Sequence, residues 1–209
     1  MKKILMTALV ASMMLVPFGA AAAVDQVEIP APPQQMEFVP GTTPAEDSLT
    51  DVMSPAIHAA VLAMMNHQVS GFDTGDTALS WEGLYNILSM YGQLDERVEY
   101  QGAESLLIPA ETVADYAAAL LPGMELEALP ESLADRMTYD AASDSYLVVC
   151  GNAEMTEMVL TSAPLADGQI LLTGSLVAVE DGSHLAEVQA VMDRADNLLG
   201  CELVSLALV

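Results

Sequence analysis

Three neighbouring carboxylates, those of Asp73, Asp76 and Glu82, are the first candidates for chemistry in this sequence. Carboxylate oxygens bind Ca²⁺, and an EF-hand loop needs oxygen ligands at its first, third, fifth and twelfth positions. Counted from Asp73, the third position is Gly75 and the twelfth is Leu84, so the EF-hand pattern is absent. Weak, irregular calcium binding by an acidic surface is the reading that these residues leave open.

The segment around Asp73 also resembles a catalytic signature. Phe72, Asp73, Thr74 and Gly75 stand in the order that surrounds each catalytic aspartate of the aspartic proteases. That chemistry needs two such carboxylates sharing one proton, whereas this sequence has one copy, between two predicted helices. The glycines of the segment favour a turn joining those helices. A hydrolase acting outside the cytoplasm through Asp73 is therefore kept as an alternative function, and no residue is assigned a catalytic role.

The three histidines are too dispersed to predict a metal centre. His58 and His67 are nine positions apart, which on a helix places them on opposite faces, and His184 lies far along the chain. The spacings that mark zinc hydrolases, serine hydrolases and dinucleotide-binding loops are absent from the sequence. We therefore expect neither a metal site nor a cofactor.

Cys150 and Cys201 are the only cysteines in the sequence. An even number of cysteines in an exported chain favours a disulfide, and each of these two stands at one end of a predicted strand. Two buried free thiols are the other reading. A catalytic thiol is not expected, because no histidine or lysine that could activate it stands beside either cysteine.

The charge balance excludes several classes of function. The chain has 30 acidic residues against five lysines and arginines, and its formal net charge is −25. Such a surface repels phosphate backbones and anionic lipid headgroups, so nucleic acids and anionic membranes are not expected partners. Lys2 and Lys3 are the only lysines. If the N-terminal residues that carry these two lysines are cleaved off, Schiff-base chemistry, pyridoxal phosphate and a P-loop are excluded, since each needs a lysine amine.

The beginning of the chain has the three parts of a cleavable signal peptide. Lys2 and Lys3 provide the positive charge, residues 4–18 are mostly apolar, and residues 20–23 are alanines suited to cleavage. The apolar stretch is shorter than the roughly 20 residues that cross a bilayer. No cysteine stands near the cleavage site to carry a lipid. We expect residues 1–23 to be removed and the protein to be secreted, or extracytoplasmic, without a lipid anchor.

Two further segments follow the signal peptide. Residues 24–50 are rich in proline and cannot bury enough apolar surface to offset the entropy of ordering, so they are predicted to form a disordered linker. Residues 51–209 are long enough to bury a core and are predicted to form a single domain.

The first part of that domain has helical periodicity. One helix is predicted to begin at Ser54 and Pro55, a second to follow Ser80 and end at Gly92, and a third to begin around Pro109 and end before Gly123. The second and third carry aromatic residues at helical spacing, which form either core or the wall of a pocket. The candidate ligand-binding residues are Trp81, Tyr85, Tyr91 and Tyr116.

After Leu133 the pattern changes to short apolar runs separated by turn residues, which is typical of antiparallel hairpins. The Asp-Gly pairs at residues 167–168 and 181–182 are strong hairpin signals, because both turn positions must tolerate positive φ. Residues 183–199 fit a helix nearly as well as a strand, and the preceding Asp-Gly pair favours the strand. We expect a meander of about five or six strands.

This order of elements resembles the cystatin-like and NTF2-like folds. Residues 108–113, 139–146 and 203–206 also look like segments of uncharacterised exported proteins of Gram-positive bacteria. The resemblance implies an α+β fold, with three N-terminal helices packed on one face of a curved antiparallel sheet, and a bacterial extracytoplasmic location. It carries no catalytic residue across. In such folds the helices and the sheet can enclose an apolar pocket.

The leading hypothesis from the sequence is therefore a non-enzymatic, exported acidic domain that binds a small apolar ligand or an extracellular protein partner. The hydrolase acting through Asp73 is one alternative, and an acidic cation-binding surface protein is another. The sequence names no specific ligand, substrate or biological role.

Overall fold

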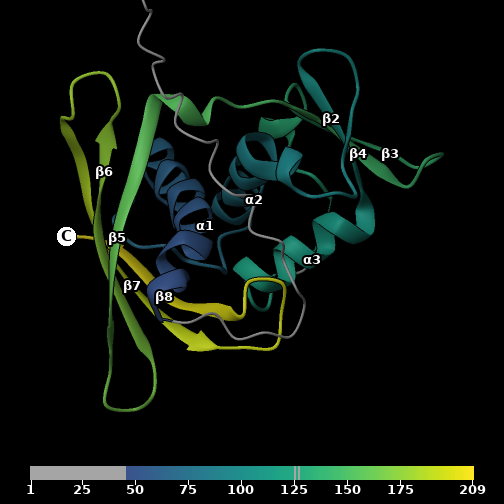
Figure 1. Cartoon of the computed structure of the whole chain (residues 1–209). Helices are drawn as coiled ribbons and strands as arrows, with labels where there is room; N and C mark the ends of the chain where they lie inside the picture. Colours follow the sequence, from purple (N-terminus) through teal and green to yellow (C-terminus); the bar gives the residue numbers. More distant parts are fainter. Residues whose placement is uncertain (1–45, 125, 127) are drawn as a thin grey trace, which may run out of the picture. The chain divides into compact units, whose positions relative to one another are not determined.

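The computed structural model describes residues 46–124, 126 and 128–209, so the predicted signal peptide and residues 24–45 of the predicted linker lie outside it. This part of the chain combines helices with two antiparallel sheets of four strands each (Figure 1). The α+β class expected from the sequence is confirmed. The α-helices are α1 (Glu46–His67), α2 (Thr77–Tyr91) and α3 (Ala110–Leu120), and the 3₁₀ turns are η1 (Gly92–Leu94), η2 (Glu131–Leu133) and η3 (Ala153–Met155).

The larger sheet is a meander in which each strand pairs with the next along the chain. Its strands, in spatial order, are β5 (Thr156–Pro164), β6 (Ile170–Ala178), β7 (His184–Arg194) and β8 (Cys201–Leu208). The two Asp-Gly turns lie where the sequence predicts them. Their glycines, Gly168 and Gly182, have φ values of 91° and 69°, which only glycine adopts without strain. The ambiguous residues 183–199 contain β7, so the strand interpretation is confirmed.

The smaller sheet has the order β1-β2-β4-β3. Its strands are β1 (Glu99–Tyr100), β2 (Ser105–Pro109), β3 (Met137–Asp140) and β4 (Ser145–Val149). The sequence places the β3 and β4 hairpin in one continuous meander with the later strands. Instead β4 pairs with β2, which precedes α3, and the predicted meander is divided between two sheets. The pairing between β2 and β4 is long-range, and local turn signals do not encode it.

The first helix begins earlier than the sequence predicts. Residues 46–50, placed in the linker by their composition, form the first turns of α1, and Leu49 is fully buried. Pro55 lies inside this helix and leaves the carbonyl group of Asp51 without its helical hydrogen bond. Asp51 is exposed, so water can satisfy that carbonyl. Ser54, predicted as a cap, instead donates its hydroxyl to the carbonyl oxygen of Met158 in β5 over 2.9 Å.

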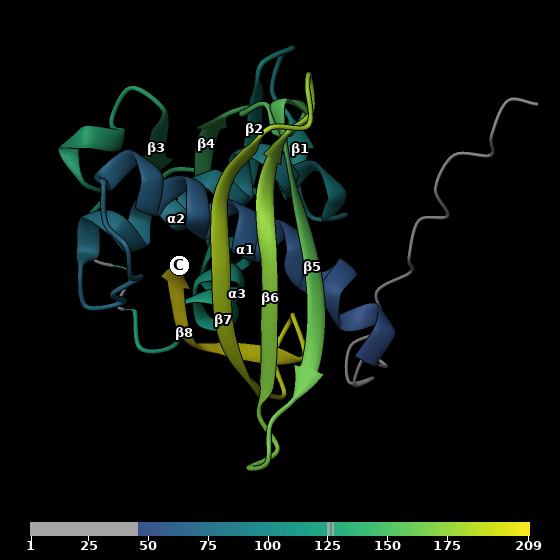
Figure 2. The same cartoon turned by 90° about the vertical axis from the view of Figure 1, so that its left-hand side faces the viewer.

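Helix α1 occupies the centre of the core. It packs against α2 on one side and against β5 and β6 on the other, as Figures 1 and 2 show. Alternate residues of the large sheet point toward this helix and are buried, among them Leu172, Val188 and Met192. The intervening residues, such as Thr173 and Gln189, lie on the opposite, more exposed face. The large sheet is therefore two-sided, with one covered face and one open face.

Helix α2 ends at the predicted glycine but begins at Thr77, before the start predicted after Ser80. Asp76 caps its first turn by accepting hydrogen bonds from the backbone N–H groups of Ala78 and Leu79, over 3.0 and 3.1 Å. Gly92 follows its last residue. Nearly every residue between these ends is buried, because the helix lies between α1 and the small sheet. Helix α3 has the expected bounds and lies near β8.

Candidate functional site

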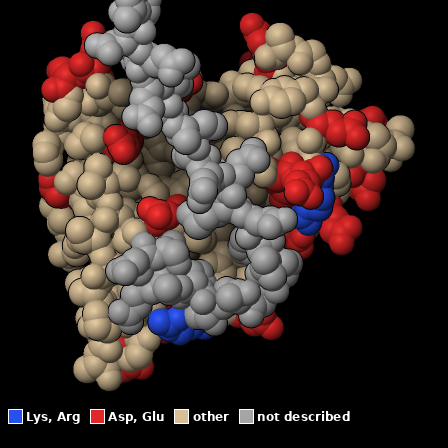
Figure 3. Space-filling view, in the orientation of Figure 1, with Lys and Arg blue, Asp and Glu red and all other residues tan. Residues whose placement is uncertain are grey.

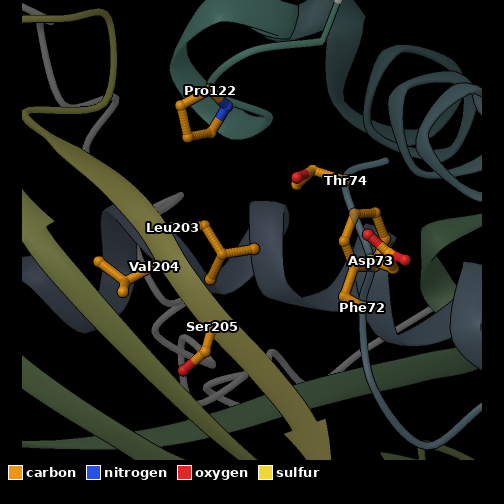
Figure 4. A pocket seen from close by; sticks show the side chains of 7 residues that line it. All are labelled: Phe72, Asp73, Thr74, Pro122, Leu203, Val204 and Ser205. Carbon is orange, nitrogen blue, oxygen red and sulfur yellow. The ribbon is translucent and has the colours of Figure 1, made fainter. Parts of the chain in front are cut away.

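A cavity of about 400 Å³ opens at the edge of the large sheet beside β8. We call it the β8 notch. Three consecutive residues of β8 form one wall, the residues that lead from the sheet edge toward α2 form another, and a proline after α3 lies at the end (Figure 4). The lining residues are Phe72, Asp73, Thr74, Pro122, Leu203, Val204 and Ser205.

The notch forms where a short extra strand leaves the sheet. Residues 70–72 pair with the second half of β8: the N–H of Phe72 donates to the carbonyl oxygen of Leu206, and the N–H of Leu208 donates to that of Ser70, each over 2.9 Å. Gly71 and Ala207 are the bridge partners. The chain then turns away at Asp73. Residues 203–205 consequently have β7 on one side and no strand of the described chain on the other.

The inner end of the notch is held in place by Phe72 and Gly83. Gly83 lies within α2, and a Cβ atom built there would approach the Cζ atom of the Phe72 ring to 3.2 Å. The ring therefore packs on the helix at a point where a larger residue would push it away. This contact fixes the direction in which the following residues, Asp73 and Thr74, leave the sheet.

A β-bulge shapes the opposite wall. The pairing between β7 and β8 shifts at Val191 and Met192, whose partners are Ser205 and Leu203, so that Val204 is the extra residue. Val204 and Ser205 are both exposed in consequence, whereas Leu203 and Leu206 on either side are buried. The sequence carries this signal, because the apolar residues at 201, 203, 206 and 208 alternate except for one interval of three. Sequence reasoning recognised the strand and missed the bulge.

The three carboxylates singled out from the sequence do not converge. Asp73 is exposed, lines the notch, and accepts a hydrogen bond from the N–H of Gly75 over 2.9 Å through its Oδ1 atom. Asp76 caps α2. Glu82 is buried on α2 and belongs to a second cavity. The turn between two helices predicted around Asp73 is therefore present, and each carboxylate has its own separate surroundings.

The second cavity, of about 380 Å³, contains an ion pair. Arg136 donates to both carboxylate oxygens of Glu82, over 2.7 and 3.1 Å, and Asn66 donates to one of them over 3.2 Å. The guanidinium also lies over the ring of Tyr85, 4.6 Å from its centroid. The oxygens of Glu82 are thus engaged by protein donors. This cluster joins α2 to the segment before β3 and is not arranged to hold a cation.

The four aromatic residues proposed to bind a ligand belong to the packed interior. Trp81 has no exposed surface and contacts Tyr146. Its indole N–H has no hydrogen-bond partner among the described residues. Tyr85 is buried and donates its hydroxyl to the carbonyl oxygen of Val149 over 3.2 Å. Neither side chain lines either of the two cavities.

Tyr91 and Tyr116 are partly buried and are also committed to the protein itself. The hydroxyl group of Tyr91 contacts His58, and Tyr116 packs against the core. Burial raises the pKa of the Tyr116 hydroxyl to about 12, despite the opposing effect of Arg97. Within the described residues, the four aromatics therefore pack in or against the core, and none of them lines the β8 notch or the cavity beside Glu82.

The three histidines lie in different surroundings. His58 is buried, His67 is exposed beside the second cavity, and His184 is exposed on β7, where its Nδ1 atom lies 2.9 Å from Glu187. The hydrogen bond from His184 lowers the pKa of the Glu187 carboxyl, and that from Ser175 adds to it. Over residues 46–124, 126 and 128–209, no group of three or more His, Cys, Asp or Glu side chains is placed to hold a metal ion.

Both cysteines are free thiols. Cys150 follows β4 of the small sheet, while Cys201 opens β8 of the large sheet. A bridge would need adjoining strand ends, and the strands beside these two residues belong to different sheets. The disulfide that the sequence suggests is therefore not formed, and Cys201 is buried in the core.

The chain was compared with protein-family models, curated proteins and solved structures, and none of them matches it. Within the part that the structure describes, no helix is both long and apolar enough to cross a membrane.

Proposed function

We propose that this chain is an exported, acidic, non-enzymatic domain that binds a protein partner at its surface. The observation that carries the proposal is the β8 notch, a cavity in which a strand edge is open and a carboxylate is exposed. An uncovered strand edge suits a protein partner, because its backbone groups can hydrogen-bond to another chain whatever the side chains of that chain are.

The packing of the interior favours a protein partner over a small apolar ligand. In the cystatin-like and NTF2-like folds that the sequence resembles, a ligand pocket can lie between helix and sheet. We propose that α1 and the large sheet correspond to the helix and sheet of those folds, because a long helix packs here against a four-stranded antiparallel meander. The corresponding space holds buried side chains from both layers, among them Ile57, Met64, Leu172 and Met192.

The charge of the surface supports the same reading. Figure 3 shows acidic side chains spread over the visible face, with few basic ones among them. A surface of this kind steers cationic partners toward it and repels acidic ones. Export rests on the signal peptide expected at residues 1–23. Mass spectrometry of the protein recovered from the medium of the producing cell should place the new N-terminus after Ala22 or Ala23.

Peptides displayed on phage and selected on the folded protein provide the test of partner binding. We expect selected peptides to shift the NMR amide signals of residues 72–74 and 203–205. The substitution Ser205→Tyr, at an exposed position in the notch, should block binding of these peptides. The same change at Gln189, also exposed but on the open face of β7, should not. Peptides that bind elsewhere, or binding that survives Ser205→Tyr unchanged, would contradict the proposal.

A further inference from the structure

Resting on this proposed function, the geometry points to the kind of partner: we propose that the β8 notch receives a short extended segment that pairs with β8 and places a lysine or arginine on Asp73. The site consists of an open strand edge and the exposed carboxylate of Asp73 beside it. The first feature recognises any extended backbone, and the second selects a basic side chain.

The backbone part of the inference follows from residues 70–72. They already add to the outer edge of β8 as an antiparallel partner, through one hydrogen bond on each side of the Gly71 and Ala207 bridge. The edge is therefore competent to pair. Because the chain leaves at Asp73, the place beside residues 203–205 that a longer strand would fill is open in the described part of the protein. A second extended segment entering there would continue the pairing.

The bulge at Val204 limits the length of that segment. A bulge interrupts the regular ladder and twists the edge, so it prevents a long, flat strand from pairing along the whole of β8. The second half of β8 is already occupied by residues 70–72. The open part of the edge is thus only a few residues long, which suits a peptide-like segment. A full strand from another sheet would need more of the edge.

Asp73 supplies the charge preference. Its Oδ1 atom is used by the N–H of Gly75, and within residues 46–124, 126 and 128–209 the carboxylate forms no ion pair with an arginine. Two of the arginines, Arg97 and Arg136, are already paired with other carboxylates. A basic side chain brought by a partner would therefore meet an uncompensated charge. A second copy of this acidic chain is disfavoured, because its net charge of −25 would be repelled.

The test uses a synthetic peptide, acetyl-Thr-Val-Lys-Val-Thr-amide, and a matched peptide with Glu in place of Lys. NMR titration of the protein should show signals of residues 203–205 shifting with the Lys peptide and much less with the Glu peptide. Asp73→Asn keeps an oxygen for the N–H of Gly75 and should weaken binding of the Lys peptide about two- to fivefold, the size of an exposed ion pair. Salt should reduce the difference.

Asp181 provides the matched control. It is an exposed aspartate whose Oδ1 also accepts a backbone N–H two residues on, that of Ser183, but it lies in the turn between β6 and β7. Asp181→Asn should leave the affinity unchanged. N-methylation of the peptide tests strand pairing, because a methylated amide cannot donate a hydrogen bond. Methyl groups on the peptide amides that face β8 should abolish binding, whereas methyl groups on the alternate amides should leave it unchanged.

The outcomes separate this inference from the proposed function. If the Lys and Glu peptides bind equally, or Asp73→Asn has no effect, the basic partner is wrong. If both N-methylated peptides bind like the parent, pairing with β8 is wrong. In either case phage-selected peptides that map to the notch would leave the proposed function intact. If no peptide of any sequence maps there, both proposals fail.

Discussion

The Nδ1 atom of His58 lies 2.6 Å from the hydroxyl oxygen of Tyr91, so that α1 and the end of α2 are joined inside the core by a polar contact. The other ring nitrogen, Nε2, lies 2.7 Å from the Oγ1 atom of Thr156, the first residue of β5. Only 1 % of the His58 surface is exposed. Two helices and a strand therefore meet at one imidazole, and both of its nitrogens are satisfied by hydroxyl groups.

Acid should weaken the fold through His58. Burial lowers its pKa below the usual value of 6.5, so the unfolded chain takes up this proton before the folded chain does. The stability that the neutral His58 side chain contributes is therefore fully present above pH 6.5. It is lost as the pH falls from 6.5 through the pKa of the folded state. Urea unfolding of the wild type and of His58→Gln should show their stability difference shrinking over that interval, by at most about 1.4 kcal/mol per pH unit. A difference independent of pH would contradict this.

The ion pair between Arg136 and Glu82 should respond asymmetrically to substitution. Arg136→Ala leaves a buried carboxylate with Asn66 as its remaining donor and should lower the free energy of unfolding by about 2 kcal/mol. The value is reduced from that of a fully buried pair because the Arg136 side chain is 38 % exposed. Glu82→Gln keeps a hydrogen-bond acceptor for Arg136 and leaves a guanidinium that water can reach. This variant should therefore lower the free energy of unfolding by only about 1 kcal/mol. Urea denaturation measures both.

Arg97→Ala is the control for that comparison. Arg97 pairs with Asp95 and Asp115 at the surface, with a side-chain exposure of 40 %. Its removal should cost less than 1 kcal/mol, roughly the value of an exposed pair. An Arg136→Ala variant no less stable than Arg97→Ala would show that the buried carboxylate of Glu82 carries no penalty when its partner is lost.

A methyl group at Gly174 should disrupt the pairing of β5 with β6. A Cβ atom there would overlap the carbonyl oxygen of Val159 on the neighbouring strand and approach the side chain of Leu160 to 2.9 Å. Backbone must move to relieve the overlap, so Gly174→Ala should lower the free energy of unfolding by about 3 kcal/mol. Gly71→Ala is the control: a Cβ atom at Gly71 meets nothing within 4 Å, and a change within about 0.5 kcal/mol is expected.

The two thiols should differ in reactivity. Both should react with a thiol reagent in denaturant without prior reduction, because no disulfide joins them. In the folded protein Cys150, which is partly exposed, should react before Cys201, which is 1 % exposed. Burial also raises the pKa of the Cys201 thiol and so keeps it protonated. Equal rates under native conditions, or no free thiol in denaturant, would overturn this prediction.

Elements with a strong local signal could be predicted from the sequence. The glycines at 168 and 182 need positive φ, and both hairpins lie at those positions. Helix α2 follows from its apolar spacing and from Gly92 at its end. The start of α1 could not be predicted in the same way, because Pro55 is usually a first-turn residue, whereas here the packing of Leu49 and Met53 extends the helix through it.

The candidate site was beyond local reasoning. Asp73 was singled out from the sequence, but as a residue of an alternative hydrolase or calcium-binding function. Its neighbours in the notch come from β8 and from Pro122 after α3. Those residues are distant in sequence, and their meeting depends on how residues 70–72 add to the sheet. The aromatic residues predicted to bind a ligand have the same spacing in a packed helix as in a pocket wall, so periodicity could not distinguish the two.

The pairing of residues 70–72 with β8 has a consequence for the order of folding. Hairpins between β5, β6 and β7 can form from segments adjacent in the chain, whereas the loop after α1 must wait for a strand that is synthesised more than a hundred residues later. A nascent or truncated chain that lacks residues 206–208 cannot close this edge. Such a chain would leave residues 70–72 without their partner strand, so we expect proteases to cut it more readily than the complete domain.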